Sequence, residues 1–419
     1  MGRPFDRVMA TRVRDASREA ATVVGLVSGS QYVNHAYLVL FPPILGTLST
    51  EFEVSLAMLG VAIGVQGAAN TAFQLPFGWL ADARDRTIAF GLSSVAGALG
   101  VLAVALAPNF PALLLGQVLI GVGVGGHHPA HYPLLSDATP DGLRGRAFSV
   151  YGVGGALGFA TPPVTFNLFT GVGLTWRHAV GAIGALGLLY ALVATALLRF
   201  VVADDVTGPN VGAETADDDE PLRERAVAAL RALANSPGIM GLTLLALLTS
   251  TASWGVNTYA VVFLDRVYGV APETANLALT GMFVVGAVAI VLGGDLTDRI
   301  APGPVMVASF AAVTGLVALL ASGLVPALVA VGALLGVGAA RSLAGPARDG
   351  LTDRLSADDT VGTNFAVVSV GVMLGGAIAP PAFGYIVDVT GPSAAFAGIG
   401  VVALAGTLVT VWLATVVAE

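Results

Sequence analysis

The chain contains no cysteine and no lysine. The absence of cysteine excludes disulfides, thiolate metal sites and thiol catalysis. All 19 basic residues are therefore arginines, and the 27 acidic residues bring the net charge to −8. An acidic, lysine-free composition of this kind is halophile-like, and a GC-rich genome is the alternative explanation.

Charge of either sign is scarce. Charged residues make up 11% of the chain and hydrophobic residues 55%, with a mean hydropathy of +0.83. A soluble chain of this length needs more charge to solvate its surface. The sequence therefore predicts a membrane protein, and its first apolar segment is too long and too polar in its middle for a signal peptide.

Apolar segments long enough to cross about 30 Å of hydrocarbon as helices recur along the chain. They cover approximately residues 21–48, 55–81, 87–106, 110–135, 143–169, 178–200, 237–264, 273–294, 303–322, 325–347, 360–387 and 393–417. A polar break divides them into two equal groups. The pattern predicts an all-α membrane protein with twelve transmembrane helices in two six-helix bundles.

Four regions follow from these boundaries. Residues 1–20 mix arginines with apolar residues and indicate a cytoplasmic amphipathic N-terminus at the membrane interface. Residues 21–200 and 237–419 are the N-terminal and C-terminal six-helix bundles. Residues 201–236 form a cytoplasmic acidic linker that is too polar to order itself in its first part. Its stretch 221–234 has the periodicity of an interfacial helix.

The arginines predict the orientation, because short arginine-rich loops stay in the cytoplasm. With the N-terminus inside, most arginines join it there: Arg84, Arg86, Arg144, Arg146, Arg199, Arg223, Arg225, Arg231, Arg299, Arg348 and Arg354. Only Arg177 and Arg266 fall outside. We expect a multi-pass protein of the cytoplasmic membrane with both termini in the cytoplasm.

The two halves repeat one another at a nearly constant offset, which indicates an internal duplication. The charged turn Gly78-Trp-Leu-Ala-Asp82-Ala-Arg-Asp-Arg86 returns in compact form as Gly294-Asp-Leu-Thr-Asp298-Arg299. Two copies of a unit with a Gly-x-Leu-x-Asp turn between its second and third apolar segments resemble the major facilitator superfamily. The resemblance covers nearly the whole chain and implies two pseudo-symmetric six-helix bundles that rock about a midplane site.

The charged turn implies a gate. In the family the pattern Gly-x-Leu-Ala-Asp-Arg-x-Gly-Arg lies between helices 2 and 3, and here Ala83 and Asp85 depart from it. By resemblance, Asp82 would cap the positive end of helix 11 and pair with an arginine of the 4–5 loop. The gating candidates are Gly78, Asp82, Arg86, Arg144, Arg146, Asp298 and Arg299. A charged turn that only sets topology is the alternative.

Helix 4 departs from the family pattern, since Gln117 stands where the resemblance places an arginine tied to proton coupling. Three of the five histidines then follow in Gly126-His127-His128-Pro129-Ala-His131-Tyr132-Pro133. The prolines must break or kink the helix and free backbone carbonyls. We interpret the histidines as cavity residues able to titrate near neutral pH. A structural role, bonding to the freed carbonyls, is equally open, and we expect no metal site.

The His-Pro pair and the start of helix 1, Ser30-Gln31-Tyr32-Val33-Asn34-His35, look like the fosmidomycin-resistance branch of drug exporters, although His35 stands where that branch often has Asp. Polar groups inside a membrane are expensive and should face the bundle interior. Interhelical hydrogen bonding is the alternative role. The candidate substrate and coupling residues are Gln31, Asn34, His35, Gln66, Asn70, His127, His128, His131, Trp254, Asn257, Arg341 and Asn364.

Arg341 is the outlier, because its charge must find a partner, water or an anionic ligand, or snorkel to the surface. The resemblance implies a secondary transporter of a small organic solute by alternating access, as an exporter. The rivals are uptake or exchange of an organic anion, favoured if Arg341 contacts ligand, and a non-transporting membrane sensor. We expect a monomer in the lipid bilayer that uses no cofactor and no nucleic acid, with a proton or sodium ion as the possible coupling ion, and no enzymatic activity.

Overall fold

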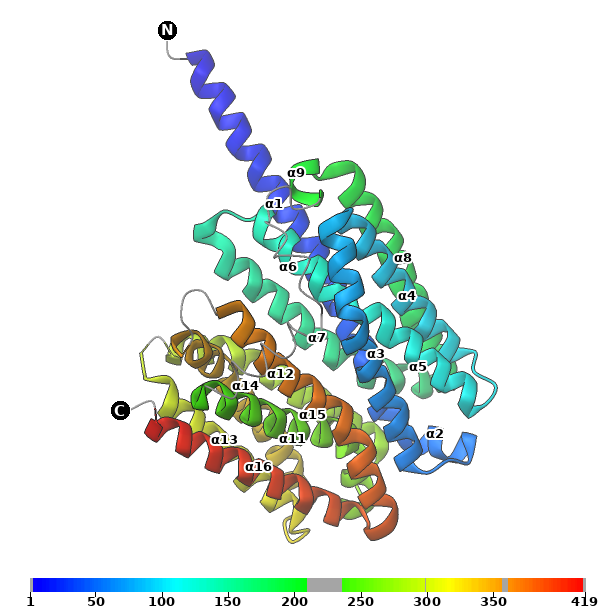
Figure 1. Cartoon of the computed structure of the whole chain (residues 1–419). Coiled ribbons are helices and arrows are strands. Elements are labelled where there is room, and N and C mark those ends of the chain that lie inside the picture. Colours follow the sequence, from blue (N-terminus) through cyan, green and yellow to red (C-terminus); the bar gives the residue numbers. More distant parts are fainter. Residues whose placement is uncertain (1–2, 209–235, 298, 356–360, 417–419) are drawn as a thin grey trace, which may run out of the picture. The chain divides into compact units, whose positions relative to one another are not determined.

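The computed structural model describes residues 3–208, 236–297, 299–355 and 361–416. Every regular element within these residues is helical. The helices form two compact units (Figure 1). Of the described residues, unit 1 contains 3–38, 69–159 and 175–208, and unit 2 contains 39–68, 160–174 and those that follow residue 235. Two segments of the first half of the chain, residues 39–68 and 160–174, therefore belong to the same unit as the second half.

Unit 1 is built around α4, which packs against α5, α6 and α8, while α1 packs against α6 and α8. Its elements are α1 (Arg3–Leu38), the later part of α3 (Leu56–Ala83), α4 (Arg86–Ala105), α5 (Phe110–Gly125), α6 (His127–Ala138), η2 (Asp141–Leu143), the start of α7 (Arg144–Gly171), α8 (Trp176–Val201) and α9 (Asp204–Thr207). A cluster of fully buried side chains that includes Phe90 and Leu134 joins α4 and α6. These contacts hold the segment that carries the histidines.

Unit 2 pairs α11 with α15 and α12 with α14, and α13 and α16 pack beside them. Its elements are η1 (Pro42–Ile44), α2 (Leu45–Phe52), the start of α3, the end of α7, α11 (Pro237–Tyr268), α12 (Pro272–Thr297), α13 (Pro302–Ala321), α14 (Ala327–Arg354), α15 (Val361–Thr390) and α16 (Pro392–Val416). Buried Ile239, Met306 and Leu413 join α11, α13 and α16.

Ten of the helices, counting α5 and α6 as one, are long and apolar enough to span a membrane within the described residues. The helices α1 and α7 complete the set of twelve, which confirms the predicted all-α fold with twelve transmembrane helices. The first predicted segment, 21–48, is wrong at its end, since α1 stops at Leu38. Pro42 and Pro43 explain this, because proline lacks the N–H that a continuing helix needs. The predicted interfacial helix over 221–234 lies outside the described residues.

Candidate functional site

A break in one helix places the histidines of unit 1. The span over Phe110–Ala138 is interrupted at Gly126, where α5 ends and α6 begins. Pro129 has no N–H, so the Gly125 carbonyl loses its helical donor. A Cβ at Gly126 would lie 2.5 Å from the Ser93 Cβ and 2.6 Å from the Phe77 ring, so only glycine fits the close approach. The predicted break therefore falls three residues before Pro129.

Four histidines gather in unit 1, and we call His35, His127, His128 and His131 the histidine cluster. Ring centroids lie 3.8 Å apart for His127 and His128, 5.3 Å for His127 and His131, and 6.1 Å for His35 and His127. Gln31 Nε2 lies 3.0 Å from His35 Nε2. His127 and His131 are fully buried, and His35 and His128 are half-buried. Residues from α1 and α6 that are far apart in sequence thus share one site.

Tyr151 of α7 joins two members of the cluster. Its hydroxyl lies 3.0 Å from His128 Nδ1 and 3.3 Å from His131 Nδ1. One hydroxyl can donate to one ring nitrogen and accept from the other, so Tyr151 couples their tautomers. Tyr151 was not among the residues predicted from the sequence. The only feature that points to it is its position directly before Gly152, Gly154 and Gly155 of α7.

Several polar atoms of this site lack a hydrogen-bond partner among the described residues. They are Gln31 Oε1, Asn34 Oδ1, His35 Nδ1, His127 Nε2 and His131 Nε2, all buried. Buried polar atoms in native proteins are paired with protein or with ordered water. The site is therefore suited to water, a proton or a polar solute group. His127 Nδ1 contacts the Val124 carbonyl, which is not the Gly125 carbonyl freed by Pro129, so the predicted bonding to a freed carbonyl stays a prediction. Among the described residues no group of His, Asp or Glu is arranged to hold a metal ion.

The charged turn of unit 1 lies between α3 and α4. Asp85, at the position where the family pattern has glycine, caps α4 by accepting from the Thr87 and Ile88 N–H groups at 2.6 and 3.3 Å. Arg86 is 1% exposed and donates to Asp137 Oδ2 at 2.6 Å and to the Val206 carbonyl at 2.8 Å. Arg86 therefore ties the end of α6 and the start of the linker to α4.

The other gating candidates lie apart from this ion pair. Asp82 is exposed and forms no ion pair with the residues that the structure describes. Arg144 Nε donates to the Ser136 carbonyl at 3.2 Å, and Arg146 and Arg299 are exposed. Gly78 lies beside Pro129, and a Cβ added at Gly78 would be 3.9 Å from the Pro129 Cβ. Asp298 lies outside the described residues. A gating role for these residues stays a prediction.

Unit 2 brings Arg341 and Asn257 together. Arg341 Nη1 donates to Asn257 Oδ1 at 2.7 Å, and its guanidinium lies 5.6 Å over the ring of Phe283. Trp254 packs against α15, where a Cβ at Gly376 would be 3.0 Å from Trp254 Nε1. The remaining candidates are separate from this pair: Gln66 is buried in the unit 2 part of α3, Asn70 is half-buried in unit 1, and Asn364 is half-buried on α15.

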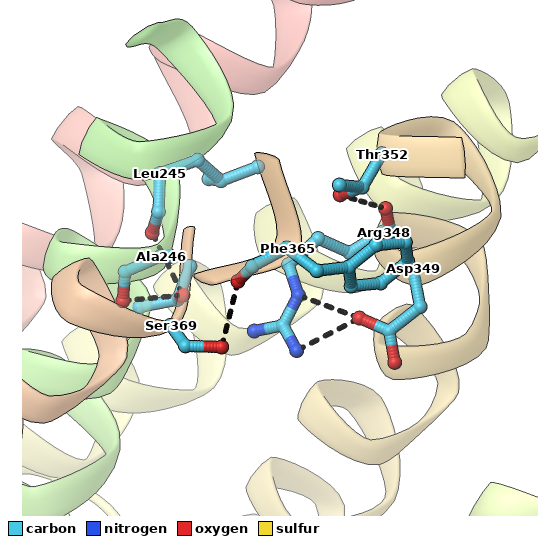
Figure 2. Close-up of polar contacts among 8 residues, drawn as sticks. Leu245, Ala246, Arg348, Asp349, Thr352, Phe365 and Ser369 are labelled. Carbon is cyan, nitrogen blue, oxygen red and sulfur yellow. Dashed lines mark hydrogen bonds and ion pairs between the residues drawn. The ribbon is translucent and has the colours of Figure 1, made fainter. Parts of the chain in front are cut away.

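The C-terminal part of α14 carries charge where α11 and α15 also begin. Arg348 of α14 donates two hydrogen bonds, of 3.1 and 3.0 Å, to Asp349 of the same helix (Figure 2). Thr352 donates to the Arg348 carbonyl at 3.0 Å, and Ser369 of α15 donates to the Phe365 carbonyl at 2.8 Å. Each of these four bonds lies within a single helix.

At the opposite end, α15 is joined to α3, and we call this the α3–α15 contact. Asp388 accepts from the Leu56 N–H at 3.1 Å and from the Ala57 N–H at 2.7 Å. A carboxylate at the first N–H groups of a helix is favourable, because these groups lack intrahelical partners and carry partial positive charge.

Deeper in the same contact, the carbonyl of Ala377 lacks its helical donor because Pro381 has no N–H. This carbonyl faces Gly64, where a Cβ would lie 2.7 Å from the oxygen. Tyr259 of α11 donates to the Pro380 carbonyl. The pair Pro380–Pro381 thus lies where α3, α11 and α15 meet, and α15 continues through these prolines.

Comparison with known proteins identifies the family. The profile described as Major Facilitator Superfamily matches residues 26–270 and 242–418. The chain belongs to the Major Facilitator Superfamily. This major facilitator is 33% identical to the inner membrane transport protein YajR of Escherichia coli over 171 residues, 39% of this chain and 35% of YajR. It is 22% identical to the fosmidomycin resistance protein of Escherichia coli, over 68% of this chain and 67% of that protein.

A solved structure supports the same fold. The bacterial homologue of the human lysosomal transporter Spinster, in an inward-facing and occupied conformation, superposes with a TM-score of 0.73 at 18% identity. The superposition covers 94% of this chain and 95% of that one. Both the family and the fold class predicted from the repeated motifs are confirmed, and the chain is that of a transporter family rather than an enzyme family.

Proposed function

We propose that this protein is a secondary transporter that exports a small organic solute across the cytoplasmic membrane by alternating access, with the histidine cluster as its proton carrier. Export is supported by the likeness to the fosmidomycin resistance protein. The single observation that carries the coupling is the gathering of four histidines from α1 and α6. Two of them contact the Tyr151 hydroxyl, and the cluster has buried ring nitrogens that no described residue pairs.

The described carboxylates are poorly placed to carry the coupling proton, which favours histidine as the carrier. Within the ten candidate spans, every described Asp or Glu lies within about one turn of a span end, as Asp137, Asp265 and Asp388 do. Gln117 is buried and cannot carry a proton at neutral pH. Histidine is the side chain whose unperturbed pKa, about 6.5, lies nearest to physiological pH.

Alternating access needs contacts that form on one side of the membrane and break on the other. The α3–α15 contact has the required chemistry, because Asp388 is held by two hydrogen bonds from backbone N–H groups. Such bonds can break and form again when the helices move apart and return. With both termini in the cytoplasm, as the arginine distribution predicts, this contact lies on the outer side. Cysteine labelling from outside the cell tests that orientation.

The test of coupling uses reconstituted liposomes and a solute found by thermal-shift screening. Histidine-to-glutamine variants at positions 35, 127, 128 and 131 keep a hydrogen-bonding side chain but cannot titrate. We expect the carrier position to lose accumulation driven by a pH step at least 10-fold and to keep solute exchange. His178→Gln is the matched control, because His178 lies in the capping box of α8, away from the cluster.

If all four variants still accumulate solute when a pH step is applied, histidine coupling is wrong, and sodium coupling or facilitated diffusion replaces it. Binding without any counterflow in the wild type would instead favour the membrane sensor. Uptake or exchange of an organic anion is the second candidate function, and the environment of Arg341 in unit 2 favours it.

A further inference from the structure

Arg341 carries a permanent charge in the interior of a spanning helix. It lies near the middle of α14 (Ala327–Arg354), and its side chain is half-buried. A charge at this depth is stabilised by an opposite charge, by polar groups or by water.

The described contacts of Arg341 are all neutral. Asn257 accepts one of its five N–H groups, and Phe283 offers the face of its ring. No acidic residue of the part of unit 2 that the structure describes forms an ion pair with Arg341. The guanidinium therefore keeps donors and a net positive charge for another group.

A small cavity lies beside Arg341 within unit 2. Its volume is about 20 Å³, which is room for one water-sized group. The lining is largely apolar and includes Val256, Phe310 and Val337. A group that enters this cavity meets few polar partners besides those of Arg341 and α11.

The polar lining of the cavity includes donors that no described acceptor uses. Ser253 forms no hydrogen bond with the described residues, so its hydroxyl proton is available. Thr249 also lines the cavity, but its proton is used on the Leu245 carbonyl at 2.8 Å. Since Asn257 directs its oxygen to Arg341, its amide N–H groups are left as donors. Thr249, Ser253 and Asn257 are spaced by four residues and share one face of α11.

We propose that Arg341 and Ser253, with Asn257 beside them, bind a single small monoanionic group. The group is a free halide or the carboxylate of the transported solute, and only in the second case does the inference rest on the proposed function. An anion accepts from all of these donors and compensates the charge, whereas a water molecule would leave the charge uncompensated.

The test measures binding to the full-length protein in detergent, at constant ionic strength in sodium methanesulfonate. Sodium chloride and sodium acetate are added in turn, with acetamide as the neutral analogue. A ligand that binds only the folded state raises the unfolding temperature as its concentration increases. We expect chloride or acetate to raise it and acetamide to have no effect.

The variants locate the site. Arg341→Gln should abolish the response, and Ser253→Ala should weaken the apparent affinity about 10-fold. Arg341→Lys should retain a weaker response, because the charge is kept and the fork of donors is lost. Arg266→Gln removes an exposed arginine of the same helix as Ser253 and should leave the response unchanged.

A rise with chloride alone assigns the site to a free halide, and a rise with acetate assigns it to a solute carboxylate. The proposal is overturned if neither anion raises the unfolding temperature, or if Ser253→Ala and Arg341→Gln respond like the wild type. No gradient is involved, so this result is independent of whether the histidine cluster couples transport to protons.

Discussion

Arg86 of unit 1 is buried and Arg341 of unit 2 is half-buried, and the groups around the two guanidinium ions differ. Arg86 stands at the first position of α4 and is held by the Asp137 carboxylate and the Val206 carbonyl. Arg341 stands near the middle of a span, where an arginine costs about 2.5–3.5 kcal/mol, and is held by one neutral amide and one ring. We therefore expect the compensated charge of Arg86 to stabilise the fold and the charge of Arg341 to remain available to a ligand.

The largest expected effect is the loss of stability on removing Arg86. Arg86→Gln leaves Asp137 and the Val206 carbonyl without their partner, and breaking such a buried pair costs about 3 kcal/mol. This is the low end of the usual range, because the Asp137 side chain is 41% exposed. Thermal unfolding in detergent measures the loss.

Arg341→Gln is the matched variant, and in buffer without chloride or carboxylates it should unfold at or above the wild-type temperature. Its removal deletes an uncompensated charge along with one hydrogen bond. Equal destabilisation by the two variants would break the comparison, because Arg341 would then be as much a part of the fold as Arg86.

A smaller effect is expected at Asp388, where a carboxylate is compensated by helix N–H groups instead of an arginine. Asp388→Asn removes the charge at the start of α3 and should weaken the α3–α15 contact by about 1 kcal/mol, or about 5-fold in its population. A cysteine placed at Leu56, which is 1% exposed, should label about 5-fold faster from outside the cell in this background.

Asp265→Asn is the control in unit 2, because Asp265 is exposed and its side chain forms no hydrogen bond with the described residues of α3. Unchanged labelling in Asp388→Asn would show that the carboxylate does not hold the contact. Labelling only after permeabilisation would overturn the predicted orientation of the chain.

The smallest effect is expected at Arg348 and Asp349, which form the exposed pair in Figure 2. The Asp349 side chain is 55% exposed, so water already compensates its charge. Asp349→Asn should change the free energy of unfolding by less than about 0.5 kcal/mol, as for most surface ion pairs. A loss comparable to that of Arg86→Gln would mean that burial does not decide how much an ion pair of this protein contributes.

Local sequence predicted part of the candidate site. His127 and His131 are four residues apart on one helix, so their proximity follows from helix geometry. The prolines of the same stretch predicted the nearby helix break. The approach of His35 to His127 and the place of Tyr151 could not be predicted, because they depend on how α1, α6 and α7 pack. The same holds for Asp85, whose departure from the family pattern is explained by its role as the N-cap of α4.

The sequence by itself determined the membrane class, the twelve helices and the duplication. The length and spacing of apolar segments are local properties, and the thickness of the hydrocarbon core requires apolar helices of that length. Only the tertiary structure decided which charges are compensated. Asp388 meets Leu56 across 332 residues, Arg86 meets Asp137 across 51, and Arg341 meets no described carboxylate in unit 2. Pairing depends on distances of about 3 Å between side chains, and these are set by helix packing rather than by spacing along the chain.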